Sequence, residues 1–194
     1  LTEMYFPSIG FFRHIIQSQF GFGDSSGDFL WLGDKRLDRR QRYLEDTNVI
    51  VTSVWRGGLL VEVTDFVHPE HDVLVRRAEV RNTSVQPVSV RLVHAEAAAL
   101  EENHDRYGHN IAYYDTRSRC FVRFRGHPFN NAVEGHCVLL IAGVPEQGAL
   151  QCGISYEQQG EQTDAFLDMA DGSLQGNEYC AGDDYCHESF HSLS

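Results

Sequence analysis

The feature that most constrains the fold is a period of two in hydrophobicity that recurs along much of the chain. In residues 60–67, 73–80, 88–94 and 119–125, successive side chains tend to alternate between two faces, and β-branched and aromatic residues are frequent. Such alternation is typical of antiparallel strands that bury one face and expose the other to water. The pattern therefore predicts a mainly all-β chain.

Turn-forming residues separate these segments. Gly57-Gly58 suits a hairpin between strands at 49–55 and 59–67, and turns are also predicted at His68–His71 and Asn82–Pro87. Further strands are predicted at 2–6, 15–22, 29–32, 111–115, 138–142 and 150–156. These short, closely spaced strands predict an antiparallel two-sheet β-sandwich.

One short helix is predicted near 161–170. Phe166, Met169 and Ala170 would share one side of that helix, and acidic residues would occupy its first turn. The sequence contains no internal repeat, low-complexity tract or Pro/Gly/Ser-rich linker. A single domain over residues 1–194 is therefore expected.

The charge of the chain is strongly negative and unevenly distributed. Sixteen basic and 28 acidic residues give a net charge of −12, which disfavours a nucleic-acid-binding role. No Lys or Arg follows Arg125, so residues 126–194 carry −11 and residues 1–125 carry −1. Such a stretch is most often a solvated face, and the alternative is a contact surface for a basic partner. The apolar runs are too short to span a bilayer, so no membrane segment is expected.

The five cysteines indicate a reducing compartment. Their number is odd and their density is low for a disulfide-stapled scaffold, so a cytoplasmic location is expected. No signal peptide is visible near the first residue. Because the chain begins with Leu1, secretion stays open as the alternative.

One local pattern has the form of a zinc site. His187-Glu188-Ser189-Phe190-His191 is H-E-x-x-H, which on a helix places two imidazoles one turn apart with Glu as general base. Cys180 and Cys186 lie close by as further candidate ligands. The flanking residues are not apolar, and a third downstream ligand has no room before Ser194. We therefore predict no metal site and keep these four residues as weak candidates.

Acidic pairs were considered because glycoside hydrolysis needs two carboxylates. Glu101-Glu102, Asp183-Asp184 and Asp65 are candidates by composition alone, and surface solvation explains such residues better. The sequence contains no G-x-S-x-G nucleophile motif and no phosphate-binding loop. We therefore predict no catalytic residue from these motifs.

A polar segment with His and Tyr residues joins two predicted strands. Residues 101–109 have the sequence EENHDRYGH and include His104, Tyr107 and His109. Loops on a rigid β-scaffold are where ligand and partner contacts concentrate. A loop of this kind is more often a solvent-exposed connection between strands without a binding role. Together with Tyr113 and Tyr114 on the following strand, these residues are the candidate domain-interface or sugar-contact site.

Several segments, taken in order, resemble the N-terminal region of bacterial and archaeal glucoamylase-like proteins of glycoside hydrolase family 15, which includes glucodextranases and some trehalases. The similarity covers nearly the whole chain. It is carried by Leu1–Gly10 (LTEMYFPSIG), 29–32 (FLWL), 42–47 (RYLEDT), 64–69 (TDFVHP), 74–82 (LVRRAEVRN), 90–93 (VRLV), 110–115 (NIAYYD), 171–177 (DGSLQGN) and 181–184 (AGDD).

The resemblance implies a specific architecture and role. In that family this region is a β-supersandwich shaped like the galactose mutarotase domain, and an (α/α)6 barrel that follows carries both catalytic glutamates. The chain would then be a non-catalytic accessory domain in carbohydrate metabolism, with residues 178–194 leading toward the barrel. The implied partner is that barrel, together with an α-glucan or oligosaccharide, and no cofactor, nucleic acid or membrane is implied.

The sequence departs from the family pattern at three places. The strand that usually precedes the first motif is missing, Val122-Arg-Phe-Arg125 stands where the family has a lysine, and the last motif continues as Asp183-Asp-Tyr-Cys186. These differences leave the substrate open: maltodextrin, dextran, trehalose or another glycoside. Two alternative functions also stay open: an independent carbohydrate-binding module that uses Tyr107, Tyr113 or Tyr114, and a zinc hydrolase that uses the H-E-x-x-H pattern.

Overall fold

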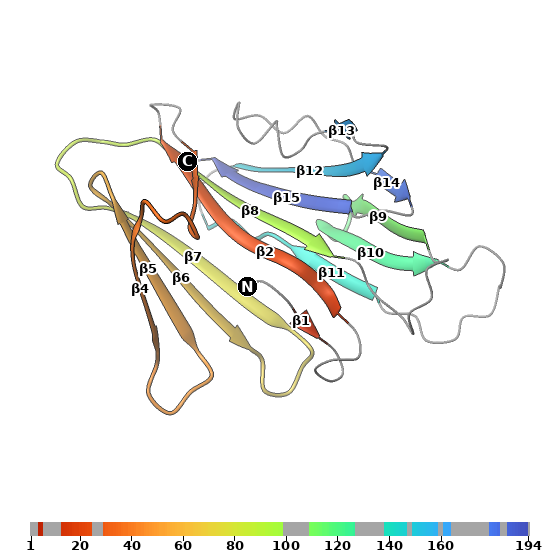
Figure 1. The fold of residues 1–194 in the computed structure, drawn as a ribbon, viewed down its shortest axis with the longest axis horizontal. Coiled ribbons are helices and arrows are strands. Elements are labelled where there is room, and N and C mark those ends of the chain that lie inside the picture. The colour runs from red at the N-terminus through yellow and green to blue at the C-terminus, as the bar shows by residue number, and fades with distance from the viewer. Residues whose placement is uncertain are drawn as a thin grey trace. The chain divides into compact units, whose positions relative to one another are not determined.

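The computed structural model describes residues 4–5, 13–24, 29–98, 109–126, 138–146, 149–158, 161–163, 179–182 and 186–193. Within these ranges the regular structure consists of β-strands, and all of the strand pairings are antiparallel. The predicted antiparallel all-β class is thus confirmed (Figure 1). None of the described residues form a helix long and apolar enough to span a bilayer.

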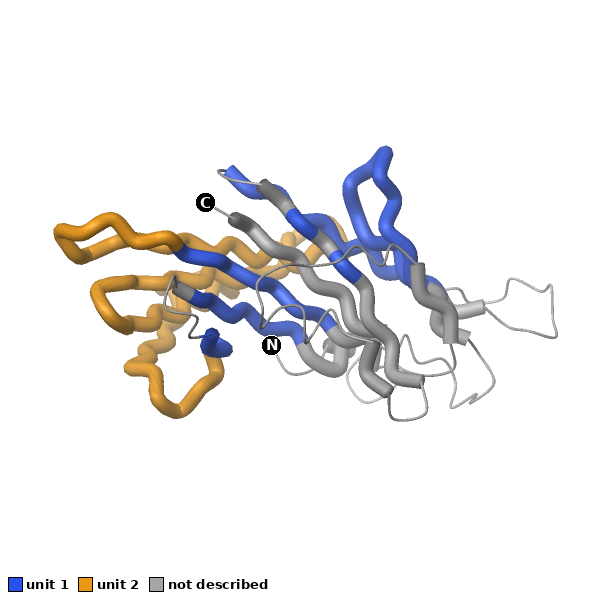
Figure 2. The backbone as a smooth tube through the Cα atoms, turned by 90° about the horizontal axis from the view of Figure 1, so that it is seen from above, with its two compact units in different colours: residues 1–31, 90–194 blue, residues 32–89 orange. Residues whose placement is uncertain are grey.

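The chain divides into two compact units. Unit 1 consists of residues 1–31 and 90–194, and unit 2 consists of residues 32–89 (Figure 2). Unit 2 is thus inserted into the sequence of unit 1, between its strands β3 and β8.

Unit 1 contains a seven-stranded sheet with the strand order β1-β2-β8-β15-β12-β13, and β3 also pairs with β2. Its central pairings join segments that are far apart in the sequence, so this sheet ties the two ends of unit 1 together. Its strands are β1 (Met4–Tyr5), β2 (Arg13–Asp24), β3 (Phe29–Trp31), β8 (Val90–Ala98), β12 (Ala149–Gln158), β13 (Glu161–Thr163) and β15 (Cys186–Leu193).

The second sheet of unit 1 has four strands in the order β11-β10-β9-β14. Strand β14 also lies close to β12 and β15 of the larger sheet. The strands are β9 (His109–Asp115), β10 (Cys120–Gly126), β11 (Val138–Ala142) and β14 (Tyr179–Gly182). In the described part of the chain, β11 pairs with β10 alone and therefore forms an edge of this sheet.

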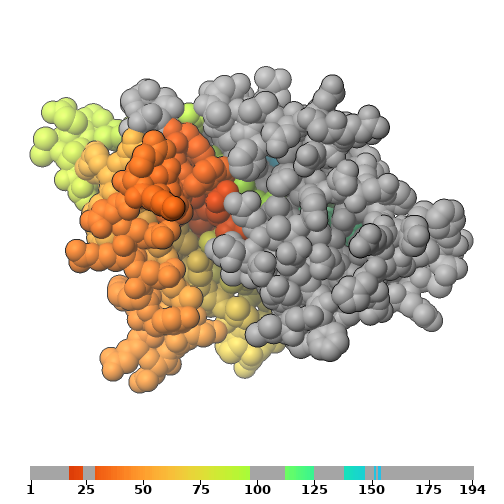
Figure 3. Space-filling model, in the orientation of Figure 1, coloured from red at the N-terminus to blue at the C-terminus, as the bar shows by residue number. Residues whose placement is uncertain are grey.

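Unit 2 is a four-stranded meander in the order β4-β5-β6-β7. The buried apolar side chains of its two central strands are Val51 and Val54 of β5 and, at alternating positions, Leu59, Val61 and Val63 of β6, with Val54 and Val61 fully buried. Strand β4 is exposed along its whole length, and in the space-filling view the orange atoms of this part of the chain lie at the surface (Figure 3). The strands are β4 (Asp38–Tyr43), β5 (Ile50–Arg56), β6 (Leu59–Val67) and β7 (Leu74–Asn82).

The predicted turns of unit 2 are confirmed. Gly57 and Gly58 connect β5 to β6 with φ angles of 56° and 83°, which a two-residue hairpin loop of this type requires and glycine readily adopts. The His68 amide donates to the carbonyl of Val73 at 2.8 Å and closes the second hairpin. After β7, the Asn82 side chain accepts from the Ser84 amide at 2.9 Å and thereby shapes the third turn.

The helix predicted near 161–170 is wrong at its beginning, because Glu161–Thr163 form strand β13 and pair with residues 156–158 of β12. Pairing with a neighbouring strand satisfies these backbone groups at once, whereas a short isolated helix is marginal in water. Residues 164–170 lie outside the described residues.

Candidate functional site

The β11-β10-β9 part of the smaller sheet carries the predicted contact residues that the structure describes. Its strand register gives two sets of side chains on opposite faces, because neighbours across the ladder point the same way. The inner face is formed by Ala112, Tyr114, Phe121, Arg123, Leu139 and Ile141. The outer face is formed by Tyr113, Val122, Phe124, Val138, Leu140 and Ala142, with Asp115 and Cys120 at one end.

The two faces differ in exposure, and apolar side chains predominate on both, with the buried Arg123 as the charged member of the inner face. On the inner face, Ala112, Phe121 and Arg123 are fully buried. On the outer face, Val138 is 55% exposed and Leu140 is 62% exposed, and Val122 and Phe124 are half-buried. The outer face therefore presents aliphatic and aromatic side chains to solvent where an ordinary antiparallel sheet would present polar ones.

The two predicted contact tyrosines lie on opposite faces of this sheet. Tyr113 is 37% exposed on the outer face, whereas Tyr114 packs edge-on against Phe121 of the inner face with ring centroids 5.1 Å apart. They therefore cannot form one flat platform together. His109 is the first residue of β9. His104 and Tyr107 lie outside the described residues.

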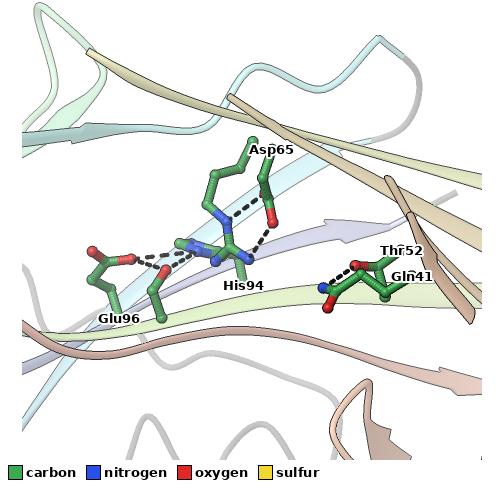
Figure 4. A network of polar contacts seen from close by, with 7 residues as sticks. Gln41, Thr52, Asp65, His94 and Glu96 are labelled. Carbon is green, nitrogen blue, oxygen red and sulfur yellow. Dashed lines mark hydrogen bonds and ion pairs between the residues drawn. The ribbon is translucent and has the colours of Figure 1, made fainter. Parts of the chain in front are cut away.

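A buried polar cluster lies on the larger sheet of unit 1, where strand β2 pairs with β8. Ser18 on β2 donates to Glu96 Oε2 on β8 at 2.5 Å, and Ser18 Oγ lies 3.1 Å from His94 Nε2. The same imidazole nitrogen is 3.4 Å from Glu96 Oε2 (Figure 4). Phe20 stacks at a tilt on His94, with ring centroids 4.7 Å apart.

The geometry of this cluster differs from that of a hydrolytic triad. Ser18 is fully buried and Glu96 is 5% exposed, so neither reaches solvent as a nucleophile or proton donor would. His94 Nε2 faces both the hydroxyl and the carboxylate, whereas a hydrolytic triad uses opposite ring nitrogens for these two groups. The contacts unite one carboxylate, one imidazole and one hydroxyl, and glycoside hydrolysis needs two carboxylates.

Several of the described acidic residues are held by local contacts. Asp65, one of the acids considered from composition, accepts from Arg76 Nε at 2.9 Å within unit 2. Side-chain hydrogen bonds from Arg36 lower the pKa of Asp34 from 3.8 to about 2. The Ser118 hydroxyl and the Arg117 amide, which both donate to Asp115, lower the pKa of that carboxyl. These groups stabilise turns and strand pairs.

The H-E-x-x-H segment is a β-strand and not a helix. His187 and His191 are both in β15, where His187 pairs with Ser155 and His191 with Gln151 of β12. Four residues of extended chain separate their Cα atoms by about 13 Å, whereas one helical turn would separate them by about 6 Å. The strand therefore removes the helical spacing on which the zinc hypothesis depended. Cys180 and Cys186 lie on β14 and β15, and the described residues contain no metal-binding group of His, Cys, Asp or Glu.

Two features of unit 1 were missed by sequence reasoning. The Ser18–His94–Glu96 cluster joins residues 76 and 78 positions apart, so only the β2–β8 register brings them together. The outer face did have a signal, because Val138–Ala142 is apolar at every position. A strand without alternation is typical of one that is covered on both faces.

The fold and the described site define an antiparallel β-domain without a recognisable hydrolytic centre among its described side chains, and known proteins resemble this domain. An uncharacterized glycosyl hydrolase from Methanocaldococcus jannaschii is 23% identical over 182 residues, which are 94% of this chain and 26% of that protein. The chain thus spans about a quarter of the relative's length. No family model matches the chain.

A solved structure resembles the whole chain. A bacterial glucoamylase in complex with acarbose matches it with a TM-score of 0.61 and 10% identity, over 100% of this chain and 29% of that chain. The likeness shows the fold, since so low an identity says nothing further. Together the two comparisons confirm the resemblance predicted from the sequence, to the N-terminal β-domain of glucoamylase-like glycoside hydrolases.

Proposed function

We propose that this chain is the non-catalytic accessory domain of a glycoside hydrolase that cleaves terminal α-glucosidic bonds in its catalytic (α/α)6 barrel. One observation carries the proposal: the chain corresponds to 26% of a glycosyl hydrolase in sequence and to 29% of a glucoamylase in fold. In proteins of that size, most of the polypeptide remains for a separate catalytic domain. The proposed partners are this barrel and the α-glucan or oligosaccharide that it cleaves, and the proposed location is the cytoplasm.

Two of the described acidic side chains, Glu96 and Asp65, support an accessory role. Inverting glycosidases hold two carboxyl groups roughly 6.5–9.5 Å apart across the scissile bond, one as acid and one as base. Glu96 is buried and accepts a hydrogen bond from Ser18, and Asp65 forms an ion pair with Arg76. Both carboxylates thus have structural contacts in place of a substrate-facing position.

The test compares the purified 194-residue chain with a longer polypeptide that includes it and the proposed barrel. Maltose, trehalose and a nitrophenyl α-glucoside are the substrates, and proton NMR follows the anomer of the released glucose. The expected result is no turnover by the chain and inversion by the longer polypeptide. Turnover by the chain alone would overturn the proposal.

A role as an independent carbohydrate-binding module is favoured by one observation, the exposed ring of Tyr113 on the outer face. Aromatic rings are amphipathic and serve as flat contact surfaces. Calorimetric titration of the chain with maltooligosaccharides separates the two roles. Saturable binding that Tyr113→Ala abolishes would establish the module, and an accessory domain gives no such heat.

A further inference from the structure

We propose that the outer face of the β11-β10-β9 sheet is the docking surface for the larger, catalytic part of the hydrolase, which contacts it through an apolar surface of its own. This inference rests on the proposed function, because it assigns the partner that the accessory domain would have. It concerns unit 1 alone.

Apolar side chains predominate on both faces of this sheet, and the charged exceptions among the described side chains are Arg123 on the inner face and Asp115 at one end of the outer face. The alternating positions of β10 place Phe121 and Arg123 on the buried face and Val122 and Phe124 on the outer face. On β11, Leu140 occupies the outer face and is 62% exposed. Antiparallel sheets that meet water on one side normally carry polar residues there, so a second apolar face indicates a second covering layer.

Two edge strands of this chain differ in the charge of their side chains. Strand β4 is an edge of the unit 2 sheet, and its sequence DRRQRY is exposed throughout. Charged side chains on an edge protect it from unwanted pairing. Strand β11 is the other case, because its sequence VLLIA has no charge although its side chains at 138, 140 and 142 are exposed. The chain protects one edge with charge and leaves the other apolar.

The size of the matching proteins points to the polypeptide that would cover this surface. About three quarters of the glycosyl hydrolase relative, and a similar share of the glucoamylase, lie outside the part that this chain matches. That polypeptide is large enough to cover the sheet. A second copy of this chain is the alternative occupant, and sedimentation of the isolated chain tests it.

A sugar is also a poor fit to this surface. Its most exposed side chains, Val138 and Leu140, are aliphatic, and Tyr113 is the exposed aromatic ring among its six members. Aliphatic side chains offer no hydrogen bonds to hydroxyl groups, whereas they pack well against another apolar protein surface. The chemistry of the outer face therefore favours a protein partner.

Hydrogen exchange of the unmodified proteins gives the first test. The backbone amides of residues 138–142 are followed in the isolated chain and in the longer polypeptide. Docking predicts that they exchange at least about tenfold more slowly in the longer polypeptide, because a covered edge opens less often. Equal exchange in the two proteins would overturn the proposal, even where the longer polypeptide hydrolyses its substrate. Turnover by the isolated chain would instead remove the proposed function.

Two variants give the second test. Val138→Lys combined with Leu140→Lys should leave the Tm of the isolated chain nearly unchanged, since both side chains already face water. In the longer polypeptide the same pair should lower the Tm by at least about 3 °C, since it would bury two charges. The matched control is Val85→Lys, a 95% exposed valine of unit 2, which should change neither protein.

Three results would count against the proposal. If the double substitution leaves the Tm of the longer polypeptide unchanged, the outer face stays in solvent. A dimer of the isolated chain in sedimentation, abolished by the double variant, would assign the surface to a second copy. Maltooligosaccharide binding by the isolated chain that disappears with Tyr113→Ala and persists in the Val85→Lys control would assign it to sugar.

Discussion

The hydroxyl of Ser18 is expected to contribute to the stability of the fold through one buried hydrogen bond. It is fully buried and donates to the carboxylate of Glu96, which is itself 5% exposed. Loss of this donor would leave a buried carboxylate with one hydrogen bond fewer, at a cost of about 1–3 kcal/mol. Ser18→Ala is therefore expected to lower the free energy of unfolding by that amount in a urea titration.

Ser53→Ala is the matched control for this substitution. The Ser53 hydroxyl donates to Glu62 Oε1 at 2.9 Å, but Glu62 is only half-buried and water can replace the lost donor. The control should therefore cost less than Ser18→Ala. An equal loss in the two variants would show that burial of the acceptor does not decide the effect.

Asp34 gives a prediction about pH. The Arg36 side chain holds the pKa of this carboxyl at about 2, below its ordinary value of 3.8. A depressed folded-state pKa stabilises the fold above the unfolded-state pKa, and the stabilisation is lost as the pH falls through the folded value. Asp34→Asn should therefore lower the Tm slightly at pH 6, and the difference from wild type should fade between about pH 4 and pH 2.

Asp46→Asn is the control for Asp34. Asp46 is an exposed residue of the same unit with a φ angle of 57°, a conformation that Asn also tolerates. Its substitution removes a surface carboxylate and leaves the Asp34–Arg36 contact in place, so it shows what the loss of a charge alone does to the Tm. If the Asp34 variant shows no pH-dependent difference in thermal melts, the Arg36 contact does not stabilise the folded state.

At the scale of elements, the pairing of strand β3 with β2 includes a glycine, Gly21. Gly21 pairs with Trp31, and a Cβ atom added at Gly21 would lie 2.9 Å from Trp31 Cε3 and closer still to the Phe29 ring. Phe29 and Trp31 meet edge to face with centroids 4.9 Å apart, and both pack against the core formed by Val93 and Ala95. The space above Gly21 is thus filled by two aromatic rings.

Gly21→Ala is accordingly expected to destabilise the chain by about 1–3 kcal/mol in a urea titration, the usual cost of overpacking. Gly33→Ala is the control, because a Cβ atom there would meet nothing within 4 Å. A neutral Gly21→Ala would mean that the Phe29 and Trp31 rings shift without loss of their contacts with Val93 and Ala95.

The alternation of side chains predicted most of the strands because it is a local property. Residues 59–67 alternate and were predicted with the bounds of β6, whereas residues 138–142 were predicted with the bounds of β11 from a short continuous apolar run. Strand β4 was missed because DRRQRY has no apolar alternation and is exposed on both sides. Strand β15 was not predicted, because residues 178–194 were expected to lead toward the barrel and HESFH, which has no β-pattern of its own, forms a strand by pairing with β8 and β12.

The candidate site was predictable in part. Tyr113 and Tyr114 were correctly placed on one strand, but their opposite facing depends on which side of β9 is buried. Unit 2 could not be separated from unit 1 in the sequence, because the division depends on non-local pairings such as that of β2 with β8. Local patterns thus gave strands and turns, and long-range register decided which residues meet.

At the scale of the whole molecule, the net charge predicts how the stability of the chain depends on salt. The net charge is −12, and residues 126–194 contribute −11 with no basic residue. Like charges gathered in a folded chain repel one another and destabilise the compact state. Salt screens such repulsion over about 8 Å at physiological ionic strength. The isolated chain should therefore melt at a higher temperature as sodium chloride rises, and a gain of about 1 kcal/mol would appear as roughly 2–4 °C.

Asp164→Asn, Asp168→Asn and Asp171→Asn together reduce the charge of residues 126–194 from −11 to −8. The triple variant should gain less stability from salt than wild type, because it has less repulsion to screen.

The longer polypeptide separates two interpretations of the acidic stretch. A solvated face predicts that it also gains stability with salt, whereas contact with a basic surface of the catalytic part predicts a loss, since salt weakens attraction as well. A wild-type chain that loses stability as salt rises would contradict the self-repulsion on which both interpretations depend.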